Sequence, residues 1–362
     1  MAPDDFVLDV LGARIAVEFT GPATMHAESV MTPWSRCLAT DKQIVDETPR
    51  IRLRSGNRPG VADRLSRLVT LRAIEQQRHR LLMLHAGAVC HGDRAVAFVA
   101  ASGGGKTTAT RTLATRYGYL TDETTAVDAD FRVLPFPKPL SVLQPTGQWK
   151  QQLSPDAAGL ARPTHPHPTL RRLVVLDRRD DIDQPQLSRL DLAQAMPVLG
   201  PQISYLSALP RPLHRLVALI QQCGGVLRVS YSEAVDLIDV VEELFDTAPA
   251  PGTPDVAAPS PRADSSTTEP IAAPGSYARA AVTDQLAIDD RVAVLVDNRL
   301  LILDGVGAAT WRALGHCADA ASIVDAVTEE LGQPGGDLDP AVVVDSALAQ
   351  LRSSGLVVGA HA

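Results

Sequence analysis

A glycine-rich stretch at residues 100–107 constrains the fold of this chain more tightly than any other feature. It reads Ala-Ala-Ser-Gly-Gly-Gly-Lys-Thr and lies between an apolar run at residues 95–99 and a helical pattern at residues 107–117, which Gly118 closes. A short buried strand, a glycine turn and a helix in this order are typical of an α/β sheet domain. Further strand patterns at 172–176, 216–220 and 226–229 support this fold class, and residues 230–233 have capping-box spacing before a last helix.

The same stretch is suited to binding phosphate. It follows the spacing G-x-x-x-x-G-K-[ST] except at Ala100, where the pattern has Gly. Backbone N–H groups at a helix N-terminus attract phosphate, while Lys106 adds a charge and Thr107 offers a hydroxyl to Mg²⁺. A plain glycine turn is the alternative, but it would not need Lys-Thr at this offset. The expected ligands are ATP and Mg²⁺, and the expected nucleotide-binding residues are Ser102, Gly103, Gly104, Gly105, Lys106, Thr107 and Thr108.

An acidic pair, Asp122 and Glu123, ends the next strand pattern, which begins at Tyr119. A right-handed crossover through the helix would place this strand parallel to the first one, with its carboxyl end beside the phosphate site. A carboxylate there could accept a proton or hold Mg²⁺. The alternative is a solvated pair in a surface turn.

The chain divides at a segment rich in proline, alanine, serine and threonine, residues 247–276. Such a composition cannot build a core and is typical of a flexible tether. We therefore expect an α/β domain at residues 1–246, a disordered linker at 247–277 and a small domain at 278–362.

Charge and composition exclude several classes of protein. A net charge of −8 argues against binding to nucleic acid. Four cysteines without metal-type spacing, no secretory signal and no long apolar run predict a cytoplasmic protein that does not enter a membrane.

The small C-terminal domain has the pattern of a hairpin followed by three helices. Strands are expected at 291–296 and 299–303, joined by Asp297-Asn298, and helices at 307–314, 321–331 and 340–353. This order predicts a small α+β, winged-helix-like domain.

Four motifs in the first 245 residues together resemble the HPr-kinase-like serine kinases, especially the branch found with ribosomally made peptides, including lasso peptides. They are Leu-His-Ala-Gly-Ala-Val at 84–89, the glycine-rich loop, Thr-Asp-Glu at 121–123 and Pro-Phe-Pro-Lys-Pro-Leu at 135–140. The resemblance covers roughly residues 50–245. It implies a P-loop domain of the HPr-kinase and PEP-carboxykinase type. The relatives are often hexameric, but no feature of this sequence indicates an oligomer, so the oligomeric state stays open.

The resemblance also assigns roles. It implies that Asp122 is the general base, that Glu123 supports Mg²⁺ together with Thr107 or positions Asp122, and that His85 and Lys106 lie at the transferring phosphate. Lys138 could contact phosphate or substrate, or could be a solvated loop lysine. Residues 1–50 carry strand-like stretches without a functional interpretation.

The apolar string at residues 300–311 and the string at 351–357 resemble the PqqD family, whose domains recognise leader peptides of ribosomally synthesised, modified peptides. In that family the leader adds to an edge strand beside the last helix, a mode in which backbone hydrogen bonds and side-chain pockets cooperate. The residues implied to bind the leader are Arg299, Leu300, Leu301, Ile302, Leu303, Val343, Ala347 and Gln350.

We therefore expect an ATP-dependent kinase that phosphorylates a serine of a precursor peptide, whose leader the C-terminal domain holds. Other peptide-modifying enzymes are conceivable partners. The alternatives are a non-catalytic ATP-binding chaperone or adaptor and a kinase of a carrier protein or small metabolite. The precursor, the modified serine and the number of phosphates cannot be read from the sequence.

Overall fold

The computed structural model describes residues 5–41, 44–45, 47–101, 103–142, 150–248, 275–315, 319–336 and 338–359. It is a mixed α/β structure that separates into two compact units. The first comprises residues 1–190, 202–209 and 218–252, and the second comprises 191–201, 210–217 and 253–362. Most of the expected linker, residues 249–274, lies outside the described residues.

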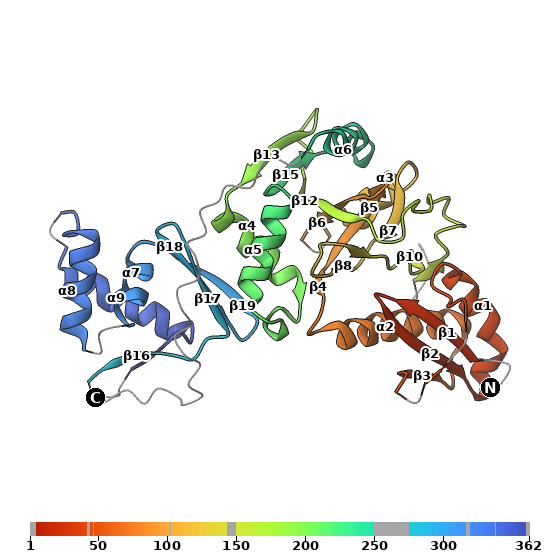
Figure 1. Ribbon diagram of the computed structural model, residues 1–362, viewed down its shortest axis with the longest axis horizontal. Helices are drawn as coiled ribbons and strands as arrows, with labels where there is room; N and C mark the ends of the chain where they lie inside the picture. Colours follow the sequence, from red (N-terminus) through yellow and green to blue (C-terminus); the bar gives the residue numbers. More distant parts are fainter. Residues whose placement is uncertain are drawn as a thin grey trace. The chain divides into compact units, whose positions relative to one another are not determined.

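A six-stranded sheet organises the first unit, in the order β13-β15-β12-β6-β5-β7 (Figure 1). Its strands are β5 (Ala86–His91), β6 (Arg94–Val99), β7 (Gly118–Thr121), β12 (Thr169–Arg178), β13 (Gln186–Leu190) and β15 (Val226–Tyr231). Strands β6, β12 and β15 are parallel, whereas β5 runs antiparallel to both β6 and β7. The strand β7 is therefore parallel to β6, as expected, but β5 lies between them.

Helices α3 (Lys106–Leu113) and α6 (Leu237–Asp246) pack against this sheet. Their apolar side chains form one core with sheet residues that include Phe98, Val174 and Val229. Burial of about 25 cal/mol per Å² of apolar surface favours this packing. The core thereby fixes the helix that begins at the glycine-rich loop.

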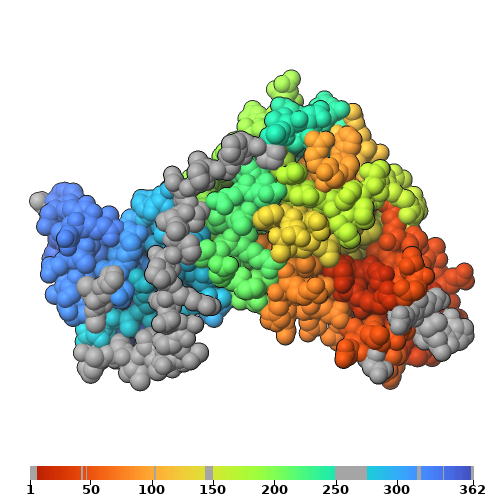
Figure 2. Space-filling model, in the orientation of Figure 1, coloured from red at the N-terminus to blue at the C-terminus, as the bar shows by residue number. Residues whose placement is uncertain are grey.

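The N-terminal residues form a second sheet with its own core. The strands β1 (Asp5–Val10) and β2 (Ala13–Phe19) are antiparallel, and β3 (Arg50–Leu53) pairs parallel to β2. The core that they share with helices α1 (Ala27–Met31) and α2 (Arg58–Gln77) also includes Met83 and Phe136. In the space-filling view, the red surface of the N-terminal residues continues into the orange surface beside it (Figure 2).

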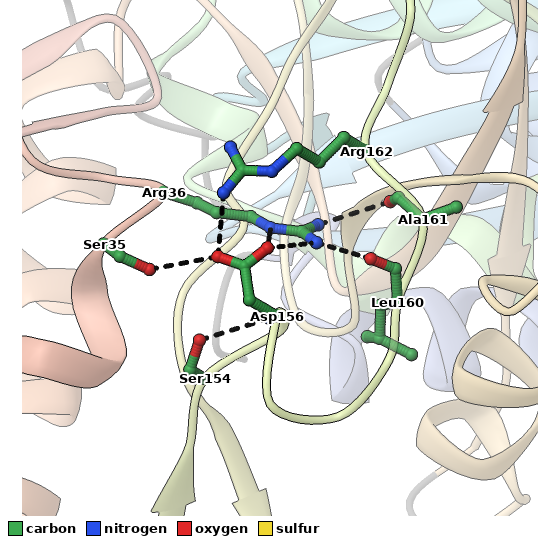
Figure 3. A network of polar contacts seen from close by, with 7 residues as sticks. All are labelled: Ser35, Arg36, Ser154, Asp156, Leu160, Ala161 and Arg162. Atoms are coloured by element: carbon green, nitrogen blue, oxygen red, sulfur yellow. Dashed lines mark hydrogen bonds and ion pairs between the residues drawn. The ribbon is translucent and has the colours of Figure 1, made fainter.

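A buried arginine ties this N-terminal layer to the rest of the unit (Figure 3). Arg36 donates to Asp156 Oδ1 from Nη2 at 2.8 Å and also donates to the carbonyl oxygens of Leu160 and Ala161. Its side chain is only 4% exposed. Ser35 and Arg162 donate to the other carboxylate oxygen, Oδ2. Asp156 therefore joins residues that lie far apart in the sequence.

Smaller elements complete the first unit. The strands β14, β4, β8 and β9 form a four-stranded sheet, and β10 pairs with β11. Their bounds are β4 (Leu82–Leu84), β8 (Thr125–Val127), β9 (Val133–Leu134), β10 (Leu140–Val142), β11 (Gln151–Leu153) and β14 (Ile203–Ser204). Short 3₁₀ turns lie at Gly21–His26, Thr32–Trp34, Leu206–Ala208 and Ala234–Asp236.

The second unit contains a three-stranded antiparallel sheet, a two-stranded sheet and three packed helices. The first sheet has the order β17 (Asp284–Ile288), β18 (Arg291–Val296) and β19 (Arg299–Leu303), and β16 (Tyr277–Arg279) pairs with β20 (Val357–Gly359). Helices α7 (Gly305–Ala313), α8 (Ala320–Leu331) and α9 (Pro340–Ser353) share a core around Trp311. Helix α4 (Leu192–Leu199) also falls within this unit, and the 3₁₀ turn Gly200–Gln202 contains the boundary, since Gln202 belongs to the first unit.

Three details differ from the sequence-based expectations. Residues 216–220 belong to a helix, α5 (Pro212–Gln222), and not to a strand, because their apolar side chains continue a helical repeat. Helix α3 ends at Leu113, and Gly118 begins β7, where a Cβ would lie 2.7 Å from Pro163 Cα. The expected capping box at residues 230–233 is also wrong, since β15 continues to Tyr231 and Glu233 makes no side-chain cap.

Across the described residues, none of the helices combines the length and the apolar character that crossing a lipid bilayer requires.

Candidate functional site

The glycine-rich loop connects the end of β6 to the first residue of α3. Gly103 and Gly105 both have φ of +80°, a conformation that glycine adopts without strain. The N–H of Gly104 donates to the carbonyl of Ala101 at 2.9 Å, which closes the turn. Ser102 lies outside the described residues. Ala100, the departure from the spacing pattern, is buried before this turn begins.

The end of a neighbouring strand restricts the loop from one side. A Cβ at Gly105 would lie 2.9 Å from the hydroxyl oxygen of Tyr231, the last residue of β15. Together with the positive φ, this close approach leaves room only for glycine at the N-cap of α3. The loop is therefore held in shape by the sheet beside it.

Lys106 is the first residue of α3 and is largely buried. Its Nζ donates to the backbone carbonyl of His85 at 2.9 Å. Burial lowers the pKa of Lys106 to about 8, although the carboxylates of Asp122 and Glu123 act in the opposite direction. The bond to His85 holds the ammonium group over the turn that separates β4 from β5.

Asp122 follows directly after β7 and is 7% exposed. Its Oδ1 accepts a hydrogen bond of 3.0 Å from the hydroxyl of Tyr119, which is fully buried. Desolvation raises the pKa of Tyr119, and the neighbouring Asp122 carboxylate raises it further. The tyrosine therefore remains a hydrogen-bond donor and fixes the orientation of this carboxylate.

Glu123 is paired with a lysine that the sequence did not place beside it. Its Oε2 lies 2.7 Å from Nζ of Lys138, whose side chain is 4% exposed against 35% for the glutamate. Burial would lower the pKa of Lys138, but the carboxylates of Glu123 and Asp122 outweigh this effect and raise it. The expectation that Lys138 is a solvated loop lysine is therefore wrong.

These groups line a single cleft in the first unit, with a volume of about 490 Å³. The ring of His85 also belongs to it, and partial desolvation and the nearby ammonium of Lys106 lower the pKa of this histidine. The sequence-predicted residues that the cleft brings together are His85, Gly103, Gly104, Gly105, Lys106, Thr107, Thr108, Asp122 and Glu123.

Part of the cleft wall comes from residues that the sequence did not identify. Helix α2 contributes Asp63, Ser66 and Arg67, and the β10–β11 hairpin region contributes Ser141 and Lys150. Arg67 Nε lies 3.2 Å from Asp63 Oδ2, and the arginine side chain is 72% exposed. No local motif marks these positions, because helix α2 reaches the cleft only through the tertiary packing.

The side chains fit a metal ion only in part. Thr107 and Asp122 both line the cleft, but the Glu123 carboxylate is already engaged by Lys138. Within the described ranges, no group of three or more His, Cys, Asp or Glu side chains is arranged to hold a metal ion. A nucleotide would therefore have to supply most of the ligands of a bound Mg²⁺.

The second unit has a separate open cleft of about 690 Å³. Val343, Ala347 and Gln350 of α9 line it opposite residues 304–307 at the start of α7. Residues 299–303 form β19, which in the described part of the chain pairs only with β18. These strand residues do not line the cleft, and Leu301 and Leu303 pack against the core. Of the eight predicted leader-binding residues, the structure therefore brings only the three on helix α9 to this cleft.

Comparison of the chain with protein-family models gives no match, and comparison with curated proteins gives none either.

Proposed function

We propose that the first unit is an ATP- and Mg²⁺-dependent kinase that transfers the γ-phosphate to a serine hydroxyl of a ribosomally made precursor peptide. The observation that carries this proposal is the meeting of Lys106, the glycine turn and Asp122 in one cleft. A phosphate-binding turn alone would suit any nucleotide-binding protein. A buried, oriented carboxylate beside it is what a phosphotransferase needs in addition.

Each residue of the cleft has its own role in this proposal. The loop amides and Lys106 hold the triphosphate, so Lys106 exchanges the His85 carbonyl for phosphate oxygens. When bound, Mg²⁺ neutralises charge on the phosphate oxygens. Asp122, oriented by the Tyr119 hydroxyl, accepts the proton of the serine hydroxyl as the serine oxygen attacks the γ-phosphorus, and the bond from that phosphorus to the β–γ bridging oxygen breaks and releases ADP. His85 lies at the cleft, close to the transferring phosphoryl group in this proposal.

The acceptor enters from the wall formed by α2 and the β10–β11 region. Those residues are not needed to hold a triphosphate, and the wall is polar, which suits a peptide backbone and a hydroxyl side chain. The second unit holds the leader at β19 and α9 in this proposal, with the leader adding as a strand to β19. A tether between the two parts raises the local concentration of the serine near Asp122.

Mass spectrometry of a reaction with Mg·ATP and a candidate precursor peptide tests the proposal. We expect the mass of at least one phosphoryl group to be added to a serine of the peptide. Asp122→Asn should reduce transfer by roughly 10²-fold or more, the contribution typical of a general base, and should leave peptide affinity unchanged. Asp130→Asn, a change of an exposed aspartate outside the cleft, is the matched control.

Other outcomes would identify another function. Peptide that is bound but never phosphorylated would indicate an ATP-binding chaperone or adaptor. Transfer to a carrier protein or small metabolite, but to no peptide, would indicate a different kinase. Equal transfer by the Asp122→Asn variant would remove Asp122 from the role of base.

A further inference from the structure

Lys138 is the most deeply buried charged group of the cleft, and its surroundings fix its position. It lies in the segment Pro137-Lys138-Pro139, where the two prolines restrict the backbone. Its side chain is 4% exposed. Besides Glu123, the described residues give Nζ one long contact of 3.4 Å to the carbonyl oxygen of Pro139, and the Asp122 carboxylate acts on it through its charge. The ammonium group therefore depends on the Glu123 carboxylate as its partner.

A buried ammonium group without a counter-ion is strongly unfavourable, so this pair is not readily exchanged for another. Glu123 is the more exposed partner and could turn to water, but Lys138 could not. If Glu123 moved to bind a divalent ion, Lys138 would lose its partner. If Glu123 bound both, a divalent ion and the ammonium would share one carboxylate and repel each other.

Asp122 is coupled to Lys138 only through its charge, which helps to raise the pKa of the lysine, and its carboxylate is not held in the ion pair that Glu123 forms. Its Oδ1 accepts from a neutral hydroxyl, that of Tyr119, and the residue still lines the cleft. Thr107 also lines the cleft and is exposed. These two residues lie beside the loop that would carry the phosphates, so they remain available to a divalent ion that arrives with a nucleotide.

We infer that the cleft takes one divalent ion, beside Thr107, and that Lys138 occupies the position of a second one. Glu123 therefore binds the ammonium group of Lys138 in place of Mg²⁺. This inference rests on the proposed nucleotide binding and replaces the expectation that Glu123 is a metal ligand. In this arrangement Lys138 is a positioning residue. It neutralises Glu123 and holds it in place next to Asp122.

Binding of Mn²⁺ together with a non-hydrolysable ATP analogue tests the inference without any turnover. Electron paramagnetic resonance of free Mn²⁺ gives the number of bound ions, and a fluorescent analogue gives nucleotide affinity. We expect one Mn²⁺ per bound nucleotide in the unchanged chain. Lys138→Met, which has similar length but no charge, should free Glu123 and add a second Mn²⁺.

The double variant Glu123→Gln with Lys138→Met removes both partners of the pair. It should bind one Mn²⁺ with an affinity within about twofold of the unchanged chain, because Glu123 is not a ligand of that ion. Glu242→Gln is the matched control, since it breaks the exposed pair with Arg116 outside the cleft and should change nothing. Thermal unfolding confirms that each variant is folded.

Three results would overturn the inference: two ions in the unchanged chain, a single ion in Lys138→Met, or a tenfold or larger loss of Mn²⁺ affinity in the double variant. Failure of the unchanged chain to bind the analogue would instead contradict the proposed function, and the inference would fall with it. The two failures are therefore distinguishable.

Discussion

The contact between Gly87 in β5 and Thr110 in α3 provides a sharp test of how the loop is positioned. A Cβ at Gly87 would lie 2.0 Å from Thr110 Oγ1, 3.1 Å from its Cβ and 3.2 Å from its Cγ2. Thr110 is fully buried, and among the described residues its hydroxyl has no hydrogen-bond partner. An ordinary contact begins at 3.4 Å, so Gly87→Ala would have to move the helix or the threonine by about 1.4 Å.

We expect Gly87→Ala to lower the free energy of unfolding by about 3 kcal/mol, the upper end of the usual cost of overpacking. For a unit of this size, that corresponds to a decrease in Tm of roughly 6–12 °C. Thr110→Ala removes Oγ1, which is the closest atom and the unpaired buried hydroxyl, together with Cγ2, and leaves only the threonine Cβ position at 3.1 Å. Alone, this change should therefore lower the free energy of unfolding by about 1 kcal/mol or less. In the double variant it should restore about 2 kcal/mol of the free energy that Gly87→Ala removes.

Differential scanning calorimetry of the four chains measures this coupling. Gly307→Ala is a control for the glycine change itself, since nothing lies within 4 Å of the added Cβ. Because α3 begins at Lys106, Gly87→Ala should also weaken binding of a fluorescent ATP analogue, and Thr110→Ala should restore it. Additive losses of stability in the double variant would refute this account of the packing.

Three further predictions concern charge. Lys106, with a pKa of about 8, is charged below that pH, so affinity for a fluorescent ATP analogue should fall as the pH rises from 7 to 9; a constant affinity would contradict this. Hydrogen bonding to Arg36 lowers the pKa of Asp156, so its ionised form stabilises the fold above the unfolded pKa of about 3.9, and this contribution is lost as the pH falls further. Asp156→Asn should therefore cost about 1–2 kcal/mol at pH 7 in thermal unfolding, and the difference should shrink below pH 4. Burial raises the pKa of Cys37 and Cys223 to about 12, so iodoacetamide at pH 8 should label them only in the unfolded chain, and rapid labelling of the native chain would show that they are accessible.

Local features of the fold could be predicted because their causes are local. The strand–turn–helix around residue 103 follows from an apolar run, glycines and a helical repeat within a few residues. The hairpin at residues 291–303 follows from Asp297-Asn298, and both residues adopt the positive φ that such a turn requires. Helix α9 begins as expected, with the side chain of Asp339 accepting from the N–H of Ala341.

The candidate site was only partly predictable because it combines residues that are distant in the chain. The order of β5, β6 and β7 depends on the whole sheet, and no pattern near residue 120 indicates that β5 separates the other two. The pairing of Lys138 with Glu123 is a tertiary contact of the same kind. The mistaken strand at 216–220 shows the limit of short apolar runs, which strands and buried helices share.

The shared core of β1–β3 and α2 bears on how this chain can be divided for experiments. A shortened chain beginning near residue 80 would keep the glycine-rich loop but would leave the apolar side chains of Met83 and Phe136 uncovered. Large uncovered apolar surfaces promote aggregation. It would also remove Arg67 from the cleft and leave Asp156 without its buried arginine. A fragment of the first unit that folds by itself must therefore retain β1. Deletions that aim to isolate this unit should shorten the chain from the C-terminal side instead.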